Sequence, residues 1–364
     1  MLQAKLKIRT AISMLLALPA ISGQAAVVSL PPLIPAGQTV TVASTDRVVT
    51  SGLSGTSGSG LSVAGVLNNQ GQIFTSNFAV TGIFENDGLL IANYNFNIGP
   101  DPSDGTNRKI INHLNGTILV NGYMDLYSPD AVVENAGNLL FGQPGQYSGQ
   151  IFPFFLGLIH NTGKMSFNKP LTDSQGQLLD TCGASGNVGD GQIVNDGLFE
   201  IAQNTKCHLG DHPYTQNSGT TKIDGVFDSD AEIDLNGGVL TGGGTLAFPG
   251  LSPMVTIAPG SDLGILTIDG DGSFGGTIEM QLGGAAGNDK LVVNGNLNLD
   301  GARLYVSFRE QYMLGFGQEV TLITADNITG YPVLASYPIL PGNLGYELVQ
   351  TATSIKMRIS TKPR

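Results

Sequence analysis

Apolar and polar residues alternate in short runs along most of the chain, and turns rich in asparagine and glycine separate the runs. The recurring unit is an apolar residue, then Asn-x-Gly, then two apolar residues with one residue between them. It occurs at residues 67–73, 84–90, 133–141, 159–167 and 193–201, with a weaker copy at 217–223. The apolar positions lie four residues before the glycine and two and four after it, so in an extended chain they point to one side. Each copy therefore predicts a strand, a turn and a second strand.

One such unit cannot bury its apolar side alone, whereas stacked copies bury it in a continuous core. The repeats therefore predict an all-β solenoid, a β-helix, with a cap at each end. We expect the turn residues to be structural, because stacked amide side chains hydrogen-bond from coil to coil. These residues are Asn69, Asn86, Asn135, Asn161, Asn195 and Asn217, with Gly71, Gly88, Gly137, Gly163, Gly197 and Gly219.

The pattern divides the chain into five parts. Residues 1–25 have the features of a secretory signal peptide: basic residues, then an apolar run from Ala11 to Leu18, then small residues ending at Ala25. An N-terminal cap (26–60), a solenoid repeat region (61–246), late coils (247–310) and a C-terminal β cap (311–364) are expected to follow. The apolar run is shorter than the about 20 residues of a membrane-spanning helix, and we expect no transmembrane segment. The predicted product is therefore exported.

Composition narrows the classes of function. The 364 residues include 51 glycines and no tryptophan, only 13% are charged, and the net charge is −12. Such an acidic chain lacks the basic surface that nucleic acids require, so we expect no nucleic-acid partner. The composition suits many short strands joined by glycine turns.

The only two cysteines, Cys182 and Cys207, are expected to form one disulfide in an oxidising compartment. The alternative is a metal site, because Cys207 is followed by His208, Asp211 and His212.

Two further stretches are weak candidates for binding a cation. Asp228, Asp230, Glu232 and Asp234 alternate with mostly apolar residues, so the pattern predicts four carboxylates on one outward strand face. That face is either a solvated exterior or a cation site. Residues 283–291, with Asp289, resemble the calcium-binding nonapeptide of repeats-in-toxin proteins with one residue inserted. Calcium is the one cofactor we consider, and no other is expected.

Two insertions interrupt the repeats. Residues 150–159 are the most apolar run after the signal peptide and are expected either to pack over the side of the coil or to present an apolar patch to a partner or to another copy. Residues 171–191 form a polar insertion that Cys182 would anchor at one end.

From Gly242 onward the sequence changes, with Pro259-Gly260-x-Asp262, Gly264-Ile-Leu266 and Asp289-Lys-Leu291. Residues 242–310 resemble the late passenger region of bacterial autotransporters and related exported β-solenoid proteins. The resemblance implies a right-handed β-helix that works outside a Gram-negative-type bacterium, in the medium or at the cell surface, with the periplasm as an alternative. Too few residues follow Phe308 for the translocator barrel of such proteins, so we expect no anchoring in cis.

The resemblance leaves two classes of function. The first is a non-catalytic rod that acts through its surface as an adhesin, a biofilm or extracellular-matrix component, or a fibre-forming subunit. Its partner would be another copy, a cell-surface partner such as a host protein, or a polysaccharide. The second is a polysaccharide-active lyase or glycoside hydrolase, which needs converging carboxylates or a basic proton acceptor. The sequence contains no Gly-x-Ser-x-Gly, His-Glu-x-x-His or Arg-x-Lys motif, so we predict no catalytic residues and favour the first class.

Overall fold

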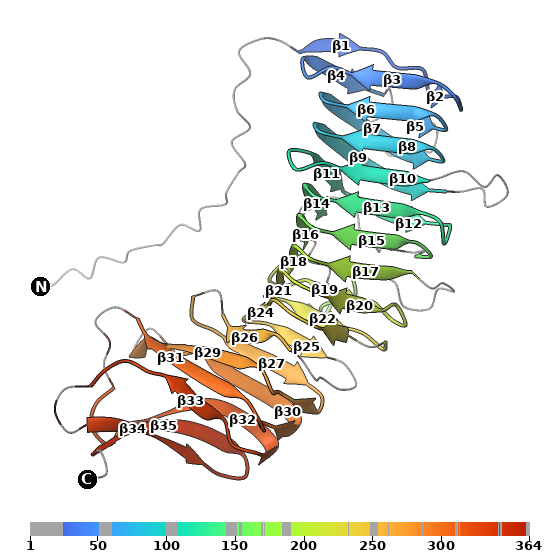
Figure 1. Cartoon of the computed structure of the whole chain (residues 1–364). Helices are drawn as coiled ribbons and strands as arrows, with labels where there is room; N and C mark the ends of the chain where they lie inside the picture. Colours follow the sequence, from blue (N-terminus) through green and yellow to red (C-terminus); the bar gives the residue numbers. More distant parts are fainter. Residues whose placement is uncertain are drawn as a thin grey trace, which may run out of the picture.

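Strands that lie one coil apart in the sequence pair in parallel and build a right-handed parallel β-helix, which confirms the predicted fold class. The computed structural model describes residues 25–361, except 51–59, 100–107, 143–150, 153–154, 169, 171, 184–190, 232, 248–253, 261, 285–286, 310–311, 313, 341 and 343. The predicted signal peptide therefore lies almost wholly outside the described residues. Within them there is no α-helix, and the strands stack in order from the N-terminal to the C-terminal end (Figure 1).

The coils are bounded by three walls of parallel strands. The first wall contains β1 (Ala26–Val28), β4 (Asp46–Val49), β7 (Gln72–Val80), β9 (Leu89–Ile98), β11 (Thr117–Val120), β14 (Asn138–Phe141), β16 (Lys164–Phe167), β18 (Leu198–Ile201), β21 (Thr220–Ile223), β24 (Val239–Gly242), β26 (Thr256–Pro259), β29 (Thr277–Leu282), β31 (Arg303–Phe308) and β33 (Val333–Ser336). The second wall contains β3 (Thr39–Val42), β6 (Val66–Asn69), β8 (Ile83–Asn86), β10 (Lys109–Asn112), β13 (Val132–Asn135), β15 (Leu158–Asn161), β17 (Gln192–Asn195), β20 (Tyr214–Gln216) and β23 (Ile233–Leu235).

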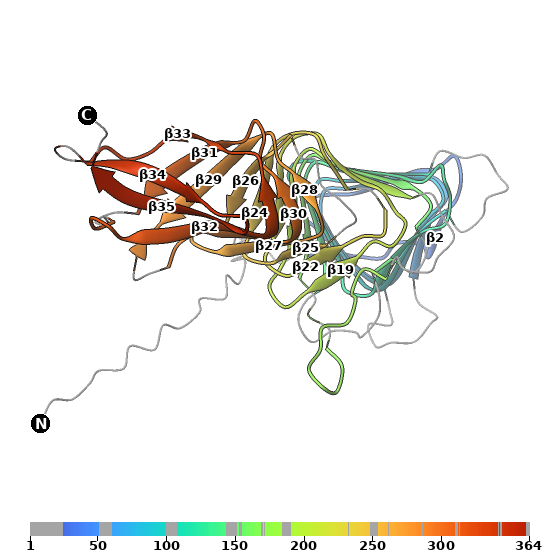
Figure 2. The same ribbon diagram turned by 90° about the horizontal axis from the view of Figure 1, so that it is seen from below.

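The third wall begins with β2 (Leu33–Ile34), β5 (Gly60–Val63), the second halves of β7 and β9, and β12 (Tyr123–Leu126). It continues with β19 (Lys206–His208), β22 (Val226–Asp228), β25 (Thr245–Ala247), β27 (Ile265–Asp269), β28 (Gly272–Ser273), β30 (Lys290–Asn298) and β32 (Glu319–Thr329). Figure 2 shows the early coils overlapping when the stack is seen from below.

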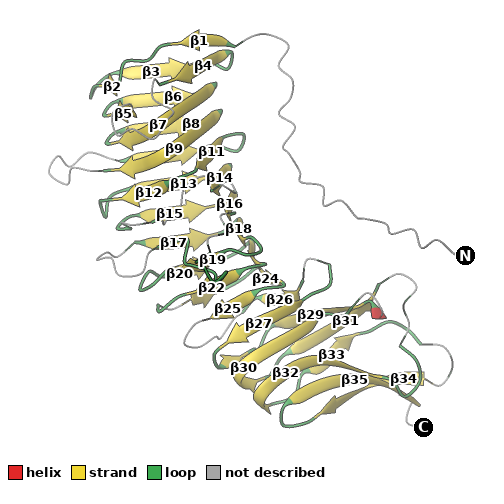
Figure 3. Cartoon of the chain, turned by 180° about the vertical axis from the view of Figure 1, so that it is seen from behind, coloured by secondary structure: helices red, strands yellow, loops and turns green. Residues whose placement is uncertain are grey.

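The cross-section changes near the middle of the chain. Among the described strands, β23 is the last in the second wall, and from β24 onward the chain alternates between the first and third walls only. The stack bends at this point, as the view from behind shows (Figure 3). At the C-terminal end the third wall is completed by an antiparallel pair, β34 (Leu344–Gln350) and β35 (Ser354–Thr361), of which β35 pairs with β32. This pair lies within residues 311–364, the range predicted for the C-terminal β cap.

The interior is a continuous column of apolar side chains. The positions that precede the Asn-x-Gly turns, among them Leu67, Phe84 and Ile159, have no exposed surface. Aromatic rings follow one another through the middle coils, with centroids 4.9 Å apart between Phe141 and Phe167 and 5.4 Å apart between Phe167 and Phe199. Alternation of inward apolar and outward polar residues therefore accounts for the fold.

Buried asparagines form a hydrogen-bonded ladder at the corner between the second and first walls. In each step the side-chain Nδ2 of one asparagine donates to the Oδ1 of the next, at 2.7 Å. The ladder runs through Asn69, Asn86, Asn112, Asn135, Asn161 and Asn195. Each side chain is at most 1% exposed, so the ladder satisfies amide groups that would otherwise be buried without partners.

Two positions of the ladder differ from the sequence pattern. Asn112 is a member of the ladder. The sequence pattern missed it because the turn between Asn112 and Gly116 is longer than the Asn-x-Gly turn. Asn217 is not a member: it is exposed, and Gln216 occupies the ladder position instead, 3.5 Å from Asn195. The turn after Gln216 is one residue longer than the turn after Asn69, so Asn217 lies outside the buried ladder, and its Oδ1 accepts a hydrogen bond from Asn236 Nδ2 of the next coil at 3.4 Å on the exposed surface.

The turn glycines stack in a second column beside the asparagines. A Cβ at Gly88 would lie 2.1 Å from the carbonyl oxygen of Gly71, and one at Gly197 would lie 2.1 Å from that of Gly163. The same carbonyls accept the N–H of the residue that starts the next coil, for example Leu198 N to Gly163 O at 2.7 Å. Glycine is therefore required here because the backbones of adjacent coils touch.

The sequence suggested that the apolar insertion, residues 150–159, either packs over the outside of the coil or forms an exposed patch. The described residues of the insertion do neither. Ile151, Phe152 and Phe155 are fully buried in the core, and the main chain of this segment bridges the third wall between β12 and the disulfide. Met124 N donates to Ile151 O at 2.6 Å, and Phe152 N donates to Cys182 O at 2.6 Å. Pro153 and Phe154 lie outside the described residues.

Candidate functional site

The carboxylates predicted to line one strand face are divided between two walls. Asp228 ends β22 in the third wall, the chain turns at Ser229 and Asp230, and Asp234 lies exposed on β23 in the second wall. Glu232 lies outside the described residues. The predicted common face was therefore wrong, because the turn interrupts the alternation.

Asp228 has basic partners instead of acidic neighbours. Its Oδ1 lies 2.5 Å from His208 Nδ1, and its Oδ2 lies 3.0 Å from Lys206 Nζ. Asp230 approaches the other ring nitrogen of His208 at 3.4 Å. Among the described residues, no three His, Cys, Asp or Glu side chains come close enough together to hold a metal ion.

The two cysteines form a disulfide, as the sequence predicted, so neither is available as a metal ligand. Cys182 and Cys207 are fully buried, and their Cα atoms are 4.8 Å apart. The bond joins adjacent rungs of the third wall, where Thr181 N donates to Lys206 O at 2.8 Å. His212, the second histidine of the alternative metal site, is buried and its Nδ1 lies 3.1 Å from Gly191 O.

We expect the double substitution Cys182→Ala, Cys207→Ala to lower the free energy of unfolding by about 3 kcal/mol, since the bond closes a loop of 25 residues. Urea unfolding followed by circular dichroism, compared with the oxidised and the reduced wild type, measures the loss. The reduced wild type should match the variant. A variant as stable as the oxidised protein would contradict a stabilising role for the bond.

A charged cluster on the outer face of the first wall surrounds Glu200. Its carboxylate lies 2.8 Å from Lys164 Nζ and 2.9 Å from Lys222 Nζ, and it accepts a hydrogen bond from Ser166. Burial disfavours the ionised carboxyl, but the hydrogen bonds from the two lysines outweigh it and lower the pKa of Glu200 to about 2. The cluster therefore ties three adjacent strands together.

This pKa makes stability depend on pH in a defined direction. Because the folded pKa lies below the ordinary value of 4.5, Glu200 stabilises the fold above that value and loses its contribution as pH falls toward 2. We expect Glu200→Gln to cost about 2 kcal/mol at pH 7, after allowing for solvent screening of the lysines. Urea unfolding of both proteins between pH 7 and about 3 should show the gap shrinking with acidity. A gap that stays constant would contradict the assignment.

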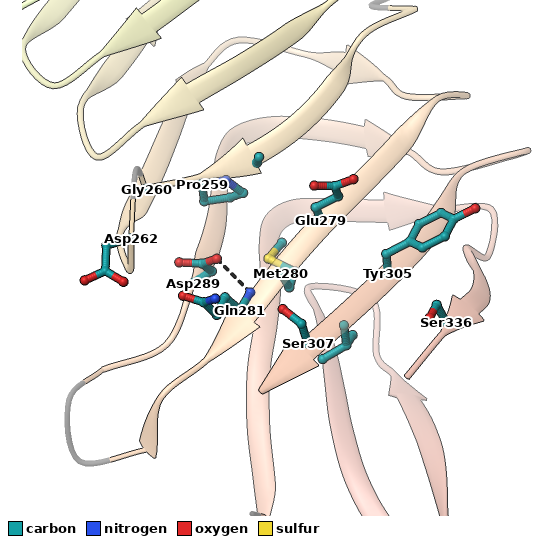
Figure 4. Close-up of a pocket in the computed structure, with 12 residues that line it drawn as sticks. Pro259, Gly260, Asp262, Glu279, Met280, Gln281, Asp289, Tyr305, Ser307 and Ser336 are labelled. Atoms are coloured by element: carbon teal, nitrogen blue, oxygen red, sulfur yellow. Dashed lines mark hydrogen bonds between the residues drawn. The ribbon is translucent and has the colours of Figure 1, made fainter. Parts of the chain in front are cut away.

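A polar groove of about 500 Å³ lies on the outer face of the late coils. Its floor comes from β26, β29, β31 and β33 of the first wall, and the turn after β26 forms one side (Figure 4). We call it the late-coil groove. Its lining comprises Ala258, Pro259, Gly260, Asp262, Glu279, Met280, Gln281, Asp289, Tyr305, Val306, Ser307 and Ser336.

Strand register arranges the outward side chains of the groove in rows across the strands. Glu279 is opposite Tyr305, which is opposite Ser336, and Gln281 is opposite Ser307. Adjacent strands are about 4.8 Å apart, so each row offers a polar group or the ring at about that interval. Glu279, Ser307 and Ser336 are exposed, whereas Tyr305 is half-buried.

The three carboxylates of the groove differ in their surroundings. Asp262 is paired with Arg309 at 2.5 Å. Asp289 is 4% exposed, and its two oxygens accept the N–H groups of Gly264 and Gln281 at 2.9 and 2.7 Å. Burial raises the pKa of Asp289 to about 6 in spite of these bonds. Its oxygens thus hold the adjoining strands, which is a structural role and not the arrangement of a calcium ligand.

Glu279 is exposed, as Asp262 is, but unlike Asp262 it forms no ion pair with another described residue. Sequence reasoning identified Asp289 but missed Glu279 and Tyr305. Each lies on a different strand, and only the register of β29 against β31 brings them together. Alternation on both strands places them outward, but nothing in the sequence marks the two strands as neighbours at this point.

The chain matches no known protein family, and no curated protein is similar to it in sequence. The likeness to autotransporter passengers is therefore supported at the level of an all-β fold with long parallel sheets. Among the described residues, no helix is long and apolar enough to cross a membrane.

Proposed function

We propose that this protein is an exported, non-catalytic β-solenoid, similar to the passengers of autotransporters, that acts through its surface as an adhesin or extracellular-matrix component. The observation that carries the proposal is the late-coil groove, which presents rows of hydroxyl, amide and carboxylate groups and one aromatic ring on a rigid wall. Sites on strands hold their side chains in fixed geometry, as recognition requires. The location we propose is the outside of a Gram-negative-type bacterium.

Two features of the groove favour binding over catalysis. A glycoside hydrolase needs two carboxyl groups that are free to act as acid and base or nucleophile. In the groove, both oxygens of Asp289 are used by backbone N–H groups, and Asp262 is paired with Arg309, which leaves Glu279. The groove is therefore better suited to hold a glycan than to cleave one.

The first experiment is an array of immobilised neutral, acidic and amino-sugar glycans, probed with the purified protein. We expect the protein to be retained on at least one glycan class, and the Tyr305→Ala variant to be retained less. After long incubation, the glycans should show no new reducing or unsaturated ends. Release of such ends would favour the polysaccharide-active enzyme and overturn the proposal. Absence of binding to every class would also overturn it.

Export is tested separately, by expression of the full chain in a Gram-negative host and N-terminal sequencing. The first strand begins at Ala26, so cleavage after Ala25 would leave every described strand intact. A product beginning at Ala26 outside the cytoplasm is the expected result. Full-length protein that stays in the cytoplasm would contradict export.

A fibre-forming subunit is the second candidate, favoured by the N-terminal end of the stack. Within the described residues, β1, β2 and β3 each pair with a strand on one side only. Unpaired edges of this kind accept strands from another molecule. Negative-stain microscopy and sedimentation at several concentrations would show filaments that lengthen with concentration if copies add at this end, and a constant monomeric rod if they do not.

A further inference from the structure

Backbone hydrogen bonding restricts what the late-coil groove can recognise. Of the four floor strands, β26, β29 and β31 are each paired with a neighbour on both sides, whereas β33 pairs with β31 alone among the described strands. The N–H and C=O groups of β26, β29 and β31 are therefore occupied, and a peptide could add as a further strand only at the edge of β33, two strands away from Glu279. Over the other three strands recognition has to come from outward side chains, which here are hydroxyl, amide and carboxylate groups around one ring.

This set of groups suits a saccharide. Hydroxyl groups of a sugar both donate and accept hydrogen bonds, and Ser307, Ser336 and Gln281 can do the same in return. The ring of Tyr305 is half-buried in the floor, so it can offer a face to the apolar C–H side of a sugar ring. The two rows extend across the strands, so a linear oligosaccharide would lie along the axis of the stack.

Charge selects among saccharides. Arg309 neutralises Asp262, whereas Glu279 has no basic partner among the described residues, and Asp289 lines the same groove. The chain as a whole carries a net charge of −12. A glycan of uronic acids would be repelled by this surface, and a protonated amine would be attracted.

We propose that the late-coil groove binds a glycan that contains free amino sugars, with an ammonium group paired to Glu279 and a sugar ring stacked on Tyr305. This inference rests on the proposed function, because it names the ligand of the same groove. The guanidinium of Arg303, on the same strand, lies over the Tyr305 ring with its Cζ 5.9 Å from the ring centroid.

Isothermal titration calorimetry with three sets of oligosaccharides of equal length tests the proposal. The sets are oligomers of glucosamine, of N-acetylglucosamine and of galacturonic acid. We expect the glucosamine oligomers to bind, the N-acetylated oligomers to bind at least about tenfold more weakly, and the uronic-acid oligomers not to bind. Binding of glucosamine oligomers should weaken as salt rises.

Matched variants locate the interaction. Glu279→Gln keeps the size of the side chain and should weaken glucosamine binding by at least about tenfold, whereas Asp234→Asn removes an exposed carboxylate from the second wall and should change nothing. Tyr305→Phe should bind nearly as the wild type does, whereas Tyr305→Ala should lose about tenfold. Circular dichroism and melting of each variant establish that it is folded.

The possible results separate this inference from the proposed function. Equal binding by Glu279→Gln and Asp234→Asn, or equal binding of the N-acetylated oligomers, would overturn the assignment of an amino sugar. Tight binding of oligolysine at Glu279 would also overturn it, because the groove would then recognise charge alone. If neutral or acidic glycans bound and Tyr305→Ala abolished that binding, the proposed function would stand, and the ligand would be a different glycan. No binding of any oligosaccharide would overturn both.

Discussion

Substitution of Gly197 by alanine is expected to lower the free energy of unfolding by about 4 kcal/mol, the largest effect of any single methyl group we predict. The added Cβ would lie 2.1 Å from the carbonyl oxygen of Gly163, which belongs to the backbone of the preceding coil and cannot rotate away. That carbonyl also accepts the N–H of Leu198, so separating the coils breaks a hydrogen bond between them. Overpacking and a lost hydrogen bond therefore act together.

The matched control is Gly243→Ala, at a late turn where an added Cβ would meet nothing within 4 Å. We expect a change within about 0.5 kcal/mol there. Urea unfolding monitored by circular dichroism gives both values. If the two variants were equally stable, the close contact between coils at Gly197 would not exist.

Substitution of Asn135 by alanine is expected to cost about 4 kcal/mol, because it removes the middle of the asparagine ladder. The side chain accepts from Asn112 at 2.7 Å and donates to Asn161 at 2.7 Å and to the carbonyl of Lys164 at 2.9 Å. After truncation, a buried N–H of Asn112 and a buried oxygen of Asn161 lose their partners. Each such group costs about 1–3 kcal/mol, and a small cavity adds to the loss.

Asn217→Ala is the comparison that tests the shift in the ladder. Asn217 is exposed, and we expect its truncation to change stability by less than about 0.5 kcal/mol. Gln216→Ala, one residue earlier, removes a fully buried side chain and should be clearly destabilising. If truncation lowered the free energy of unfolding more at Asn217 than at Gln216, Asn217 and not Gln216 would occupy the ladder position.

The parts of the fold that could be predicted are those in which one strand and its turn carry the whole signal. Inward positions such as Leu67 follow from alternation, and Asn69 with Gly71 follows from the spacing of the turn. Asn112 and Gln216 could not be assigned because turn length varies while the ladder position stays fixed. Stacking keeps the ladder side chain at the same register position in every coil, whereas the number of residues between it and the next glycine can vary.

The site was less predictable because it depends on pairing between distant strands. Glu279 and Tyr305 are 26 residues apart in sequence but opposite each other in the register. Conversely, Asp228 and Asp234 are close in sequence but lie on different walls, because a turn separates β22 from β23. The apolar insertion was misassigned for a related reason. Ile151 and Phe152 belong to the third wall through main-chain hydrogen bonds, but both are buried, so they do not show the apolar–polar alternation that marks a strand in the sequence.

The disulfide also determines how the molecule responds to tension. Each coil is held mainly by the coils next to it, so a force applied to the two ends would peel coils away in succession. The covalent link between Cys182 and Cys207 carries that force past the residues between them, which include β17 and β18, so these residues add nothing to the extension while the bond is oxidised. The residues closed off by the disulfide are thus a reserve of length that becomes available only on reduction.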